Sequence, residues 1–329
     1  MKLAIYDNTK VYVPCPANHA TGGTEVAHQL VYELNQMGIE AYIYYYRAQK
    51  DINPIHPQFQ KYVSTHAPVI EDAPENILIV PETRTEYLFR YQSIRKVIWW
   101  LSVDFFYDSA DIDRISTLKK MLGITKRFNL AKPEKLQVDL HLVQSAYAED
   151  HLRKHGITNI AHLSDYLNAA FLYDDAAPTE RKNMVLYNPK KGMQFTQQII
   201  DRSKELYWFP LINLTPMQVA EACRTAKVYI DFGHHPGKDR FPREAAISGC
   251  CIITGKKGAA SFEKDIPIAD KYKFEDKPES ILLIIDRIKY CLDKYDQATE
   301  DFENYRDIIR KQQSEFQQNL REIFVPANA

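Results

Sequence analysis

Charged side chains gather at one turn of the sequence. The stretch HHPGKDRFPREAAISGCCIITG, residues 234–255, places two basic residues, Lys238 and Arg240, just before a predicted helix that begins with Pro242. Basic side chains suit an anion at this place, because the N–H groups of a helix N-terminus also favour negative charge. A structural role fits as well, in which Glu244 complements the helix dipole and pairs with a neighbouring arginine.

Two other loops after predicted strands carry residues suited to phosphate binding. Gly22 and Gly23 lead into a helix, and without side chains their backbone N–H groups can approach a phosphate closely. A simple tight turn explains this pair equally well. Lys190 and Lys191 precede another helix, and their ammonium groups could neutralise a diphosphate. Surface lysines are common, so this loop by itself does not establish a site.

Strands and helices alternate along the chain, which predicts an α/β fold with parallel sheets. A strand at 2–6, a helix whose apolar face runs from Val26 to Met37 and a strand at 39–46 are expected to form an opening βαβ unit. Further strands are expected at 76–81, 95–101 and 138–145, and then at 184–187, 207–212, 227–232 and 250–254.

The segment at 165–182 loses this alternation, and we place the domain boundary there. The prediction is an N-terminal Rossmann-like domain over 1–170 and a C-terminal Rossmann-like domain over 171–329. Ligands of open α/β sheets bind beyond the carboxyl ends of the strands, so we expect the loops of the two domains to face each other across a cleft.

The composition limits the kinds of partner. The 329 residues include 42 Lys and Arg against 43 Asp and Glu, a balance that favours neither a nucleic-acid surface nor an acidic tail. The first residues do not resemble a signal peptide, and no stretch approaches the ~18 apolar residues of a membrane span. The five cysteines have no paired spacing and are expected to be reduced core residues. We therefore expect a cytoplasmic protein.

The order of these features resembles that of GT-B glycosyltransferases, in particular the retaining family 4 type. That family has a Gly-Gly loop after its first strand, a Lys-Gly loop in its second domain and a Glu-Ala-x-Ala-x-Gly element before an apolar strand. Glu244, Ala245 and Gly249 match the last element at the same spacing. The stretches LVQSAYAEDHLRKHGI and HLSDYLNAAF are similar to the family's strand, Ser-led helix and interdomain link. The resemblance spans nearly the whole chain and implies that the C-terminal helices cross back to the first domain.

The resemblance implies transfer of a sugar from a nucleoside-diphosphate sugar to a glycan or lipid-linked glycan acceptor, with retention and without a metal. Surface polysaccharide or glycoconjugate biosynthesis, with peripheral contact at the inner membrane face, would suit such acceptors. The implied donor-binding residues are Gly22, Gly23, Lys190, Lys191, Lys238, Arg240 and Glu244. Glu244 would accept hydrogen bonds from the ribose hydroxyls, while the basic side chains would hold the diphosphate as its charge grows.

The chain departs from the family at one position. A second glutamate usually stands eight residues before the ribose-binding one, where this chain has Pro236. Asp239 is a candidate to take over the contact with the donor sugar, as are backbone groups near Gly237. In the first domain the family places a His or an acidic residue near the reacting sugar. Asp104 is the candidate here, because it follows a predicted strand rich in aromatic residues such as Trp99. An ordinary loop aspartate beside a core strand fits this position equally well.

Two further functions stay open at this point: a nucleotide-sugar epimerase of GT-B fold, and a catalytically silent sugar-nucleotide-binding partner of a glycan assembly. The absence of Gly-x-Gly-x-x-Gly argues against a dinucleotide oxidoreductase. No Asp-x-Asp stands between a predicted strand and a loop, which favours a reaction without a metal.

Replacing Glu244 by Gln should weaken nucleoside-diphosphate binding and leave the fold intact. The change removes charge-assisted hydrogen bonds worth roughly 1.5–3 kcal/mol. Titration calorimetry measures the affinity, and a thermal unfolding curve serves as the control for folding. Unchanged affinity in a folded variant would remove Glu244 from the donor site.

Overall fold

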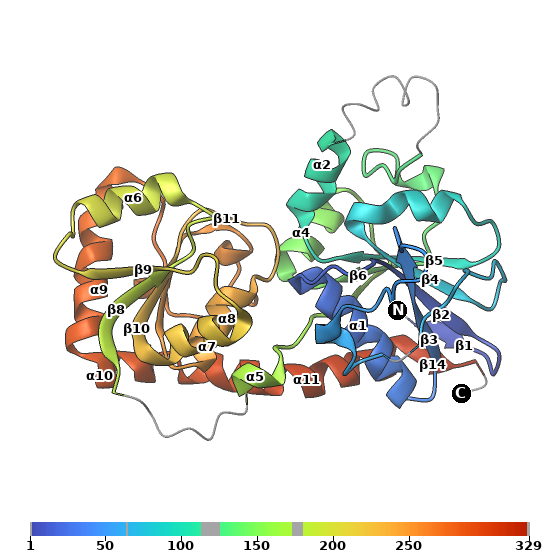
Figure 1. Ribbon diagram of the computed structural model, residues 1–329. Coiled ribbons are helices and arrows are strands. Elements are labelled where there is room, and N and C mark those ends of the chain that lie inside the picture. Colours follow the sequence, from blue (N-terminus) through green and yellow to red (C-terminus); the bar gives the residue numbers. More distant parts are fainter. Residues whose placement is uncertain (1, 64, 113–125, 173–179, 328–329) are drawn as a thin grey trace. The chain divides into compact units, whose positions relative to one another are not determined.

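Two compact units make up the chain (Figure 1). The computed structural model describes residues 2–63, 65–112, 126–172 and 180–327. Unit 1 comprises Met1–Asp165 with Ser314–Ala329, and unit 2 comprises Tyr166–Gln313. The first division, between Asp165 and Tyr166, lies shortly before the boundary that the sequence predicts after residue 170. Each unit contains a parallel β-sheet with helices, which confirms the predicted class of two Rossmann-like domains.

A six-stranded parallel sheet forms the centre of unit 1, in the order β3-β2-β4-β5-β6-β7. Its strands are β2 (Lys10–Pro16), β3 (Glu40–Tyr46), β4 (Ile77–Pro81), β5 (Arg95–Trp100), β6 (Leu140–Val143) and β7 (Ile160–His162). Its helices are α1 (Gly22–Gln36), α2 (Val103–Ile112) and α4 (Ala146–Lys154), with 3₁₀ turns η1 (Pro57–Phe59), η2 (Glu82–Phe89) and η4 (Pro133–Lys135).

The first helix follows from its sequence. Thr21 occupies the N-cap of α1, and its side chain and that of Thr24 satisfy each other's backbone N–H groups in a capping box. The apolar positions fall at helical spacing, so that Val26, Leu30 and Leu34 are buried in the core. Capping and one apolar face together explain why this stretch could be predicted as a helix.

The prediction for the first strand of the chain was wrong. We expected residues 2–6 to begin the βαβ unit, but β1 (Leu3–Ile5) pairs with β14 (Phe324–Pro326) in a separate two-stranded sheet. The unit is opened by β2, which the sequence analysis did not predict and which contains Pro14 and Pro16. Beyond Tyr12 this strand pairs only with β3, so Pro14 lies where a neighbour on the second side is missing and a lost N–H is tolerated.

Unit 2 is built on a four-stranded parallel sheet in the order β12-β10-β8-β9 (Figure 1). Its strands are β8 (Lys182–Tyr187), β9 (Tyr207–Pro210), β10 (Ala226–Asp231) and β12 (Cys251–Thr254), with a short pair β11 (His234–His235) and β13 (Lys257–Gly258). Its helices are α5 (Ala169–Leu172), α6 (Met193–Asp201), α7 (Pro216–Thr225), α8 (Arg240–Ile247), α9 (Ile281–Asp293) and α10 (Tyr295–Glu300). Its 3₁₀ turns are η5 (Ala259–Ser261), η6 (Asp270–Tyr272) and η7 (Pro278–Ser280).

The strand order of unit 2 contains a topological switch point. From β8 the chain moves to β9 on one side, and then returns to place β10 and β12 on the other side. The loops that leave β8 and β10 therefore lead to opposite sides of the sheet, and sheets of this kind bind their ligands at the carboxyl ends of two such strands. These are two of the loops in which the sequence analysis predicts residues that bind an anion.

Helix α11 (Glu303–Ile323) supplies residues to both units, because the division falls at Gln313–Ser314 within it. The cysteines are all free and buried, as expected. Among the described residues, no helix combines the length and the apolar character needed to cross a membrane.

Two glycines let the loops after β8 and β10 meet backbone to backbone. Gly192 has a φ of 59°, and a Cβ there would lie 2.1 Å from the carbonyl oxygen of Phe232. Gly233 has a φ of 97°, and its Cβ would lie 2.7 Å from the backbone nitrogen of Gly192. Both conformations favour glycine, and the contact leaves no room for a side chain on either partner.

Replacing Gly192 by Ala should therefore destabilise the protein more than replacing Gly38 by Ala. Gly38 has a similar positive φ of 80°, but a Cβ added there would meet nothing within 4 Å, so only the backbone penalty of roughly 1–2 kcal/mol applies. Thermal and denaturant unfolding of both variants measure the difference. Equal losses would show that the backbone contact at Gly192 relaxes without cost.

Candidate functional site

The candidate site lies at the switch point of unit 2. The loop after β8 carries Lys190 and Lys191, and the chain after β10 runs through β11 and a Pro-Gly turn into α8. Helix α8 begins at Arg240, earlier than the predicted start, so Pro242 lies within its first turn, where its missing N–H costs little.

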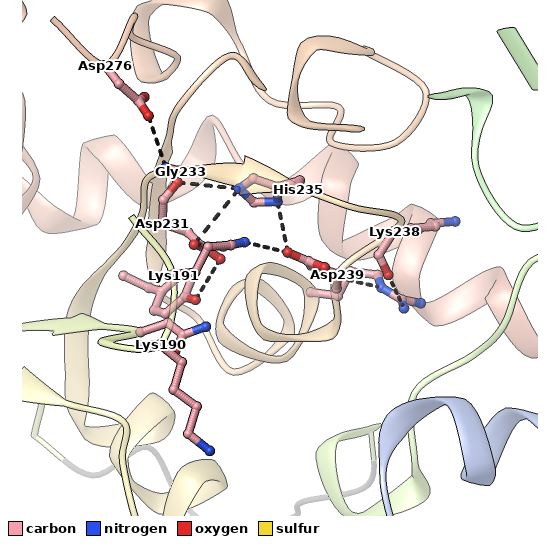
Figure 2. A network of polar contacts seen from close by, with 11 residues as sticks. Lys190, Lys191, Asp231, Gly233, His235, Lys238, Asp239 and Asp276 are labelled. Carbon is pink, nitrogen blue, oxygen red and sulfur yellow. Dashed lines mark hydrogen bonds and ion pairs between the residues drawn. The ribbon is translucent and has the colours of Figure 1, made fainter. Parts of the chain in front are cut away.

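Lys191 connects these segments through ion pairs (Figure 2). Its Nζ lies 3.0 Å from Oδ1 of Asp231, at the end of β10, and also pairs with Oδ2 of Asp239. His235 lies beside both carboxylates, with Nδ1 3.1 Å from Oδ2 of Asp239 and Nε2 3.9 Å from Oδ1 of Asp231. Tyr229 donates its hydroxyl to the other oxygen of Asp231 at 2.9 Å. We call Lys191, Asp231, His235 and Asp239 the ion-pair cluster.

Asp239 contacts this cluster and does not cap helix α8 with its side chain. It occupies the N-cap of α8, where an aspartate usually accepts a hydrogen bond from the first helical N–H groups. Its side chain makes no such capping bond and contacts Lys191 and His235 instead. The tertiary contacts therefore outweigh the capping preference at this residue.

Electrostatics keep the cluster charged. Burial raises the pKa of Asp239, but the neighbouring imidazole of His235 and the charge of Lys191 outweigh it and lower the pKa to about 2. Burial lowers the pKa of Lys191, but Asp231 and Asp239 outweigh it and hold this pKa above its usual value. Lys191 therefore meets the two carboxylates as an ammonium ion.

The same cluster has the donor set of a metal site. Asp231, His235 and Asp239 each offer one ligand atom, and these atoms lie within 4.8 Å of one another. Carboxylate and imidazole groups suit divalent ions. The Lys191 ammonium already pairs with both carboxylates, so a cation of the chain itself takes the place between them.

Glu244 lies in the second turn of α8 and is largely buried, with 11% of its side chain exposed. Its Oε1 is 4.0 Å from Nε of Arg240, one turn earlier on the same helix. Glu244 thus pairs with a neighbouring arginine, as its purely structural role predicts, at the distance limit of an ion pair. Both residues lie in the helix that follows β10, where the GT-B resemblance would place them in the donor site.

The two other predicted basic residues do not join the cluster. Figure 2 shows the side chains of Lys190 and Lys238 pointing away from it. Lys190 is exposed, and its backbone N–H donates to Asn188 at 3.0 Å. Among the four predicted bases, Lys191 is the one that the fold ties to acidic partners by ion pairs inside the cluster.

In unit 1, the predicted residues occupy two helix N-termini. Gly22 and Gly23 form the first turn of α1, and a Cβ on Gly23 would meet only the Leu101 side chain, at an ordinary 3.8 Å. The fold of unit 1 therefore does not require glycine at position 23. Asp104 stands in the first turn of α2, where its Oδ1 accepts a hydrogen bond from the Tyr147 hydroxyl at 3.4 Å.

The sequence patterns described above do not point to Asp231 or His235. The neighbouring residues His234 and His235 differ in the structure, because His234 is exposed and His235 is fully buried. The signal that would have found the cluster is the spacing Asp-x-x-x-His-x-x-x-Asp over 231–239. Periodicity did not reveal the cluster, because the three residues lie at the end of β10, in the short strand β11 and at the N-cap of α8.

Comparison with known proteins places the fold. No protein-family model matches the chain, and no curated protein matches it. Sucrose-phosphate synthase from Thermosynechococcus elongatus matches with a TM-score of 0.64 at 11% identity, over 96% of this chain and 99% of that one. HepE from Anabaena in complex with UDP and glucose matches with a TM-score of 0.60 at 10% identity, over 95% and 98%. T4 phage BGT in complex with its UDP-glucose substrate matches with a TM-score of 0.52 at 12% identity, over 95% and 98%.

These solved structures are GT-B glycosyltransferases with two Rossmann-like domains. At these identities the likeness establishes the fold, and it covers almost the full length of each chain. The GT-B resemblance drawn from the sequence is therefore confirmed at the level of structure.

Lowering the pH should reduce the stability of the folded protein by protonating Asp239. Its folded-state pKa is lower than that of an ordinary carboxyl, so its contribution to stability is fully present above about pH 4 and is lost as the pH falls toward about 2. We expect the unfolding midpoint of Asp239→Asn to lie below that of the wild type at pH 5–7 and the gap to shrink toward pH 2. A gap that stays constant over this range would mean that the charge of Asp239 does not stabilise the fold.

Proposed function

We propose that this protein is a glycosyltransferase that moves a sugar from a nucleoside-diphosphate sugar to a glycan or lipid-linked glycan acceptor. The observation that carries the proposal is the GT-B fold, shared over nearly the whole chain with HepE, which was solved with UDP and glucose, and with BGT, which was solved with UDP-glucose. A uridine donor is the first one to test for this reason.

The donor site is proposed at the switch point of unit 2. Glu244 offers two acceptor oxygens for the vicinal hydroxyls of a ribose, and Arg240 stands one turn away on the same helix to meet the diphosphate. Lys190 and Lys238 lie outside the ion-pair cluster and supply further positive charge. In a glycosyl transfer the leaving diphosphate gains negative charge, so these cations stabilise the transition state more than the ground state.

Lys191 has a different role in this proposal from the one first assigned to it. Two buried carboxylates beside a diphosphate would repel it, and the ammonium of Lys191 offsets that charge. Asp239 is held in a fixed position and is proposed to contact the donor sugar in place of the glutamate that Pro236 replaces. His235, whose Nδ1 lies 3.1 Å from Oδ2 of Asp239, is proposed to orient that carboxylate.

Unit 1 is proposed to serve the acceptor side. A side chain would fit at position 23, so packing within the unit does not require glycine, and the proposed role of Gly23 is to let the backbone approach a ligand. Asp104 at the start of α2 is the proposed acidic residue near the reacting sugar. Transfer with retention, independence from metals and a place in surface polysaccharide or glycoconjugate synthesis, cytoplasmic or peripheral at the membrane, complete the proposal.

A panel of UDP, GDP, dTDP and CMP, with their sugars, tests the function. A ligand that binds only the folded state raises the melting temperature, so one base should give the largest shift. With the matching donor, nucleotide should be released only when an acceptor is present, and the rate should survive EDTA because Lys191 supplies the local cation. Binding without turnover would indicate a silent partner, and a changed free sugar nucleotide would indicate an epimerase. Loss of all turnover in EDTA, restored by manganese or magnesium, would assign the ion-pair cluster to a metal.

A further inference from the structure

Arg243 is a buried cation next to the proposed donor site. It lies in α8, and its exposed fraction is 0%. Removing a guanidinium from water is costly unless its donors are satisfied, and an apolar side chain would fill the same space without that cost. The contacts of the guanidinium therefore indicate what this position contributes.

The guanidinium binds the turn that precedes its own helix. Nη2 donates to the carbonyl oxygen of Lys238 at 3.1 Å, and Nε donates to the carbonyl oxygen of Asp239 at 3.3 Å. The planar fork of an arginine can satisfy two neighbouring acceptors at once in a fixed geometry, which the single ammonium of a lysine cannot reproduce. One side chain thus holds two consecutive carbonyls of the turn.

A third contact orients the fork. Nη1 donates to Oε1 of Gln312 at 3.0 Å, and Gln312, in α11, is 2% exposed. Within the described part of the chain, Nε2 of Gln312 has no hydrogen-bond partner. The amide therefore acts here as an acceptor for Arg243, and the side chain from α11 fixes the plane of the guanidinium.

We propose that Arg243 is a positioning residue of the donor site, which holds the 238–239 backbone so that Asp239 meets Lys191 and His235, and that Gln312 orients it. The inference rests on the proposed function, because it assigns the consequence to donor binding. Asp239 makes no cap bond to α8, so the helix itself does not fix its carboxylate. Without the fork the two carbonyls lose these hydrogen bonds, and the carboxylate of Asp239 is no longer held against Lys191.

The test compares variants that disturb this anchor with one that disturbs a similar anchor elsewhere. Arg243→Lys keeps the charge but loses the fork, and Gln312→Leu removes the acceptor while Arg243 stays. Gln312→Glu keeps an acceptor oxygen and is the conservative variant. Arg306→Lys is the matched control: Arg306 is 7% exposed, and its Nη2 donates to the carbonyl oxygen of Thr299 in the same unit.

Titration calorimetry with UDP, or with whichever nucleotide of the panel binds the wild type most tightly, gives the affinity, and thermal unfolding gives the stability. We expect Arg243→Lys and Gln312→Leu to weaken binding by about tenfold, a change of about 1.4 kcal/mol. Gln312→Glu should weaken it at least threefold less than Gln312→Leu. Arg306→Lys should lower the melting temperature and leave the affinity unchanged. In the double variant Arg243→Lys/Gln312→Leu, the two losses should not add, because both act on one turn.

The failure of this inference is distinct from the failure of the proposed function. A wild-type protein that binds no nucleotide of the panel overturns the function. A wild type that binds, with Gln312→Leu unchanged in affinity or weakened no more than Arg306→Lys, overturns the role of Arg243. Gln312→Leu keeps Arg243 in place, so this comparison stands even if Arg243→Lys does not fold.

Discussion

The ion pairs of Lys191 with Asp231 and Asp239 are the interaction on which the rest of the candidate site depends. One ammonium joins the loop after β8, the end of β10 and the start of α8, three segments that are distant in the sequence. Each of the three charges would be costly to bury without the others. Together they fix the Pro-Gly turn relative to the sheet, and the turn in turn determines where α8 begins and where Glu244 lies.

Two local preferences are overridden around this interaction. The aspartate at the N-cap of α8 makes no capping bond, and an arginine in the same helix is fully buried. Natural sequences usually satisfy such rules, and departures gather where function requires a particular geometry. Here they both fall at the switch point of unit 2, where a fold of this kind binds its ligands. The position of the departures supports the placement of the donor site independently of any sequence motif.

The core of each unit could be predicted because it depends on local patterns. Buried parallel strands such as β4 and β10 are short apolar runs between turn residues, and α1 carries an apolar face and a capping box. β2 contains two prolines, Pro14 and Pro16, which are untypical of a strand, and they are tolerated because the pairing of β2 with β4 ends at Tyr12. That information lies in the pairing of strands and not in the sequence of the strand itself.

The sequence alone determined the class of fold and the free, buried cysteines, and it predicted the loops of the candidate site, because strand ends, glycines and charges are local features. Only the tertiary structure decided which charges meet. Lys190 and Lys191 are adjacent and chemically identical, yet Lys191 pairs with two carboxylates whereas Lys190 is exposed. His235 is buried beside Asp239 while His234 is not, and Arg243 binds a glutamine 69 residues further along the chain. These choices depend on side-chain direction and on distances between segments, which composition and spacing do not encode.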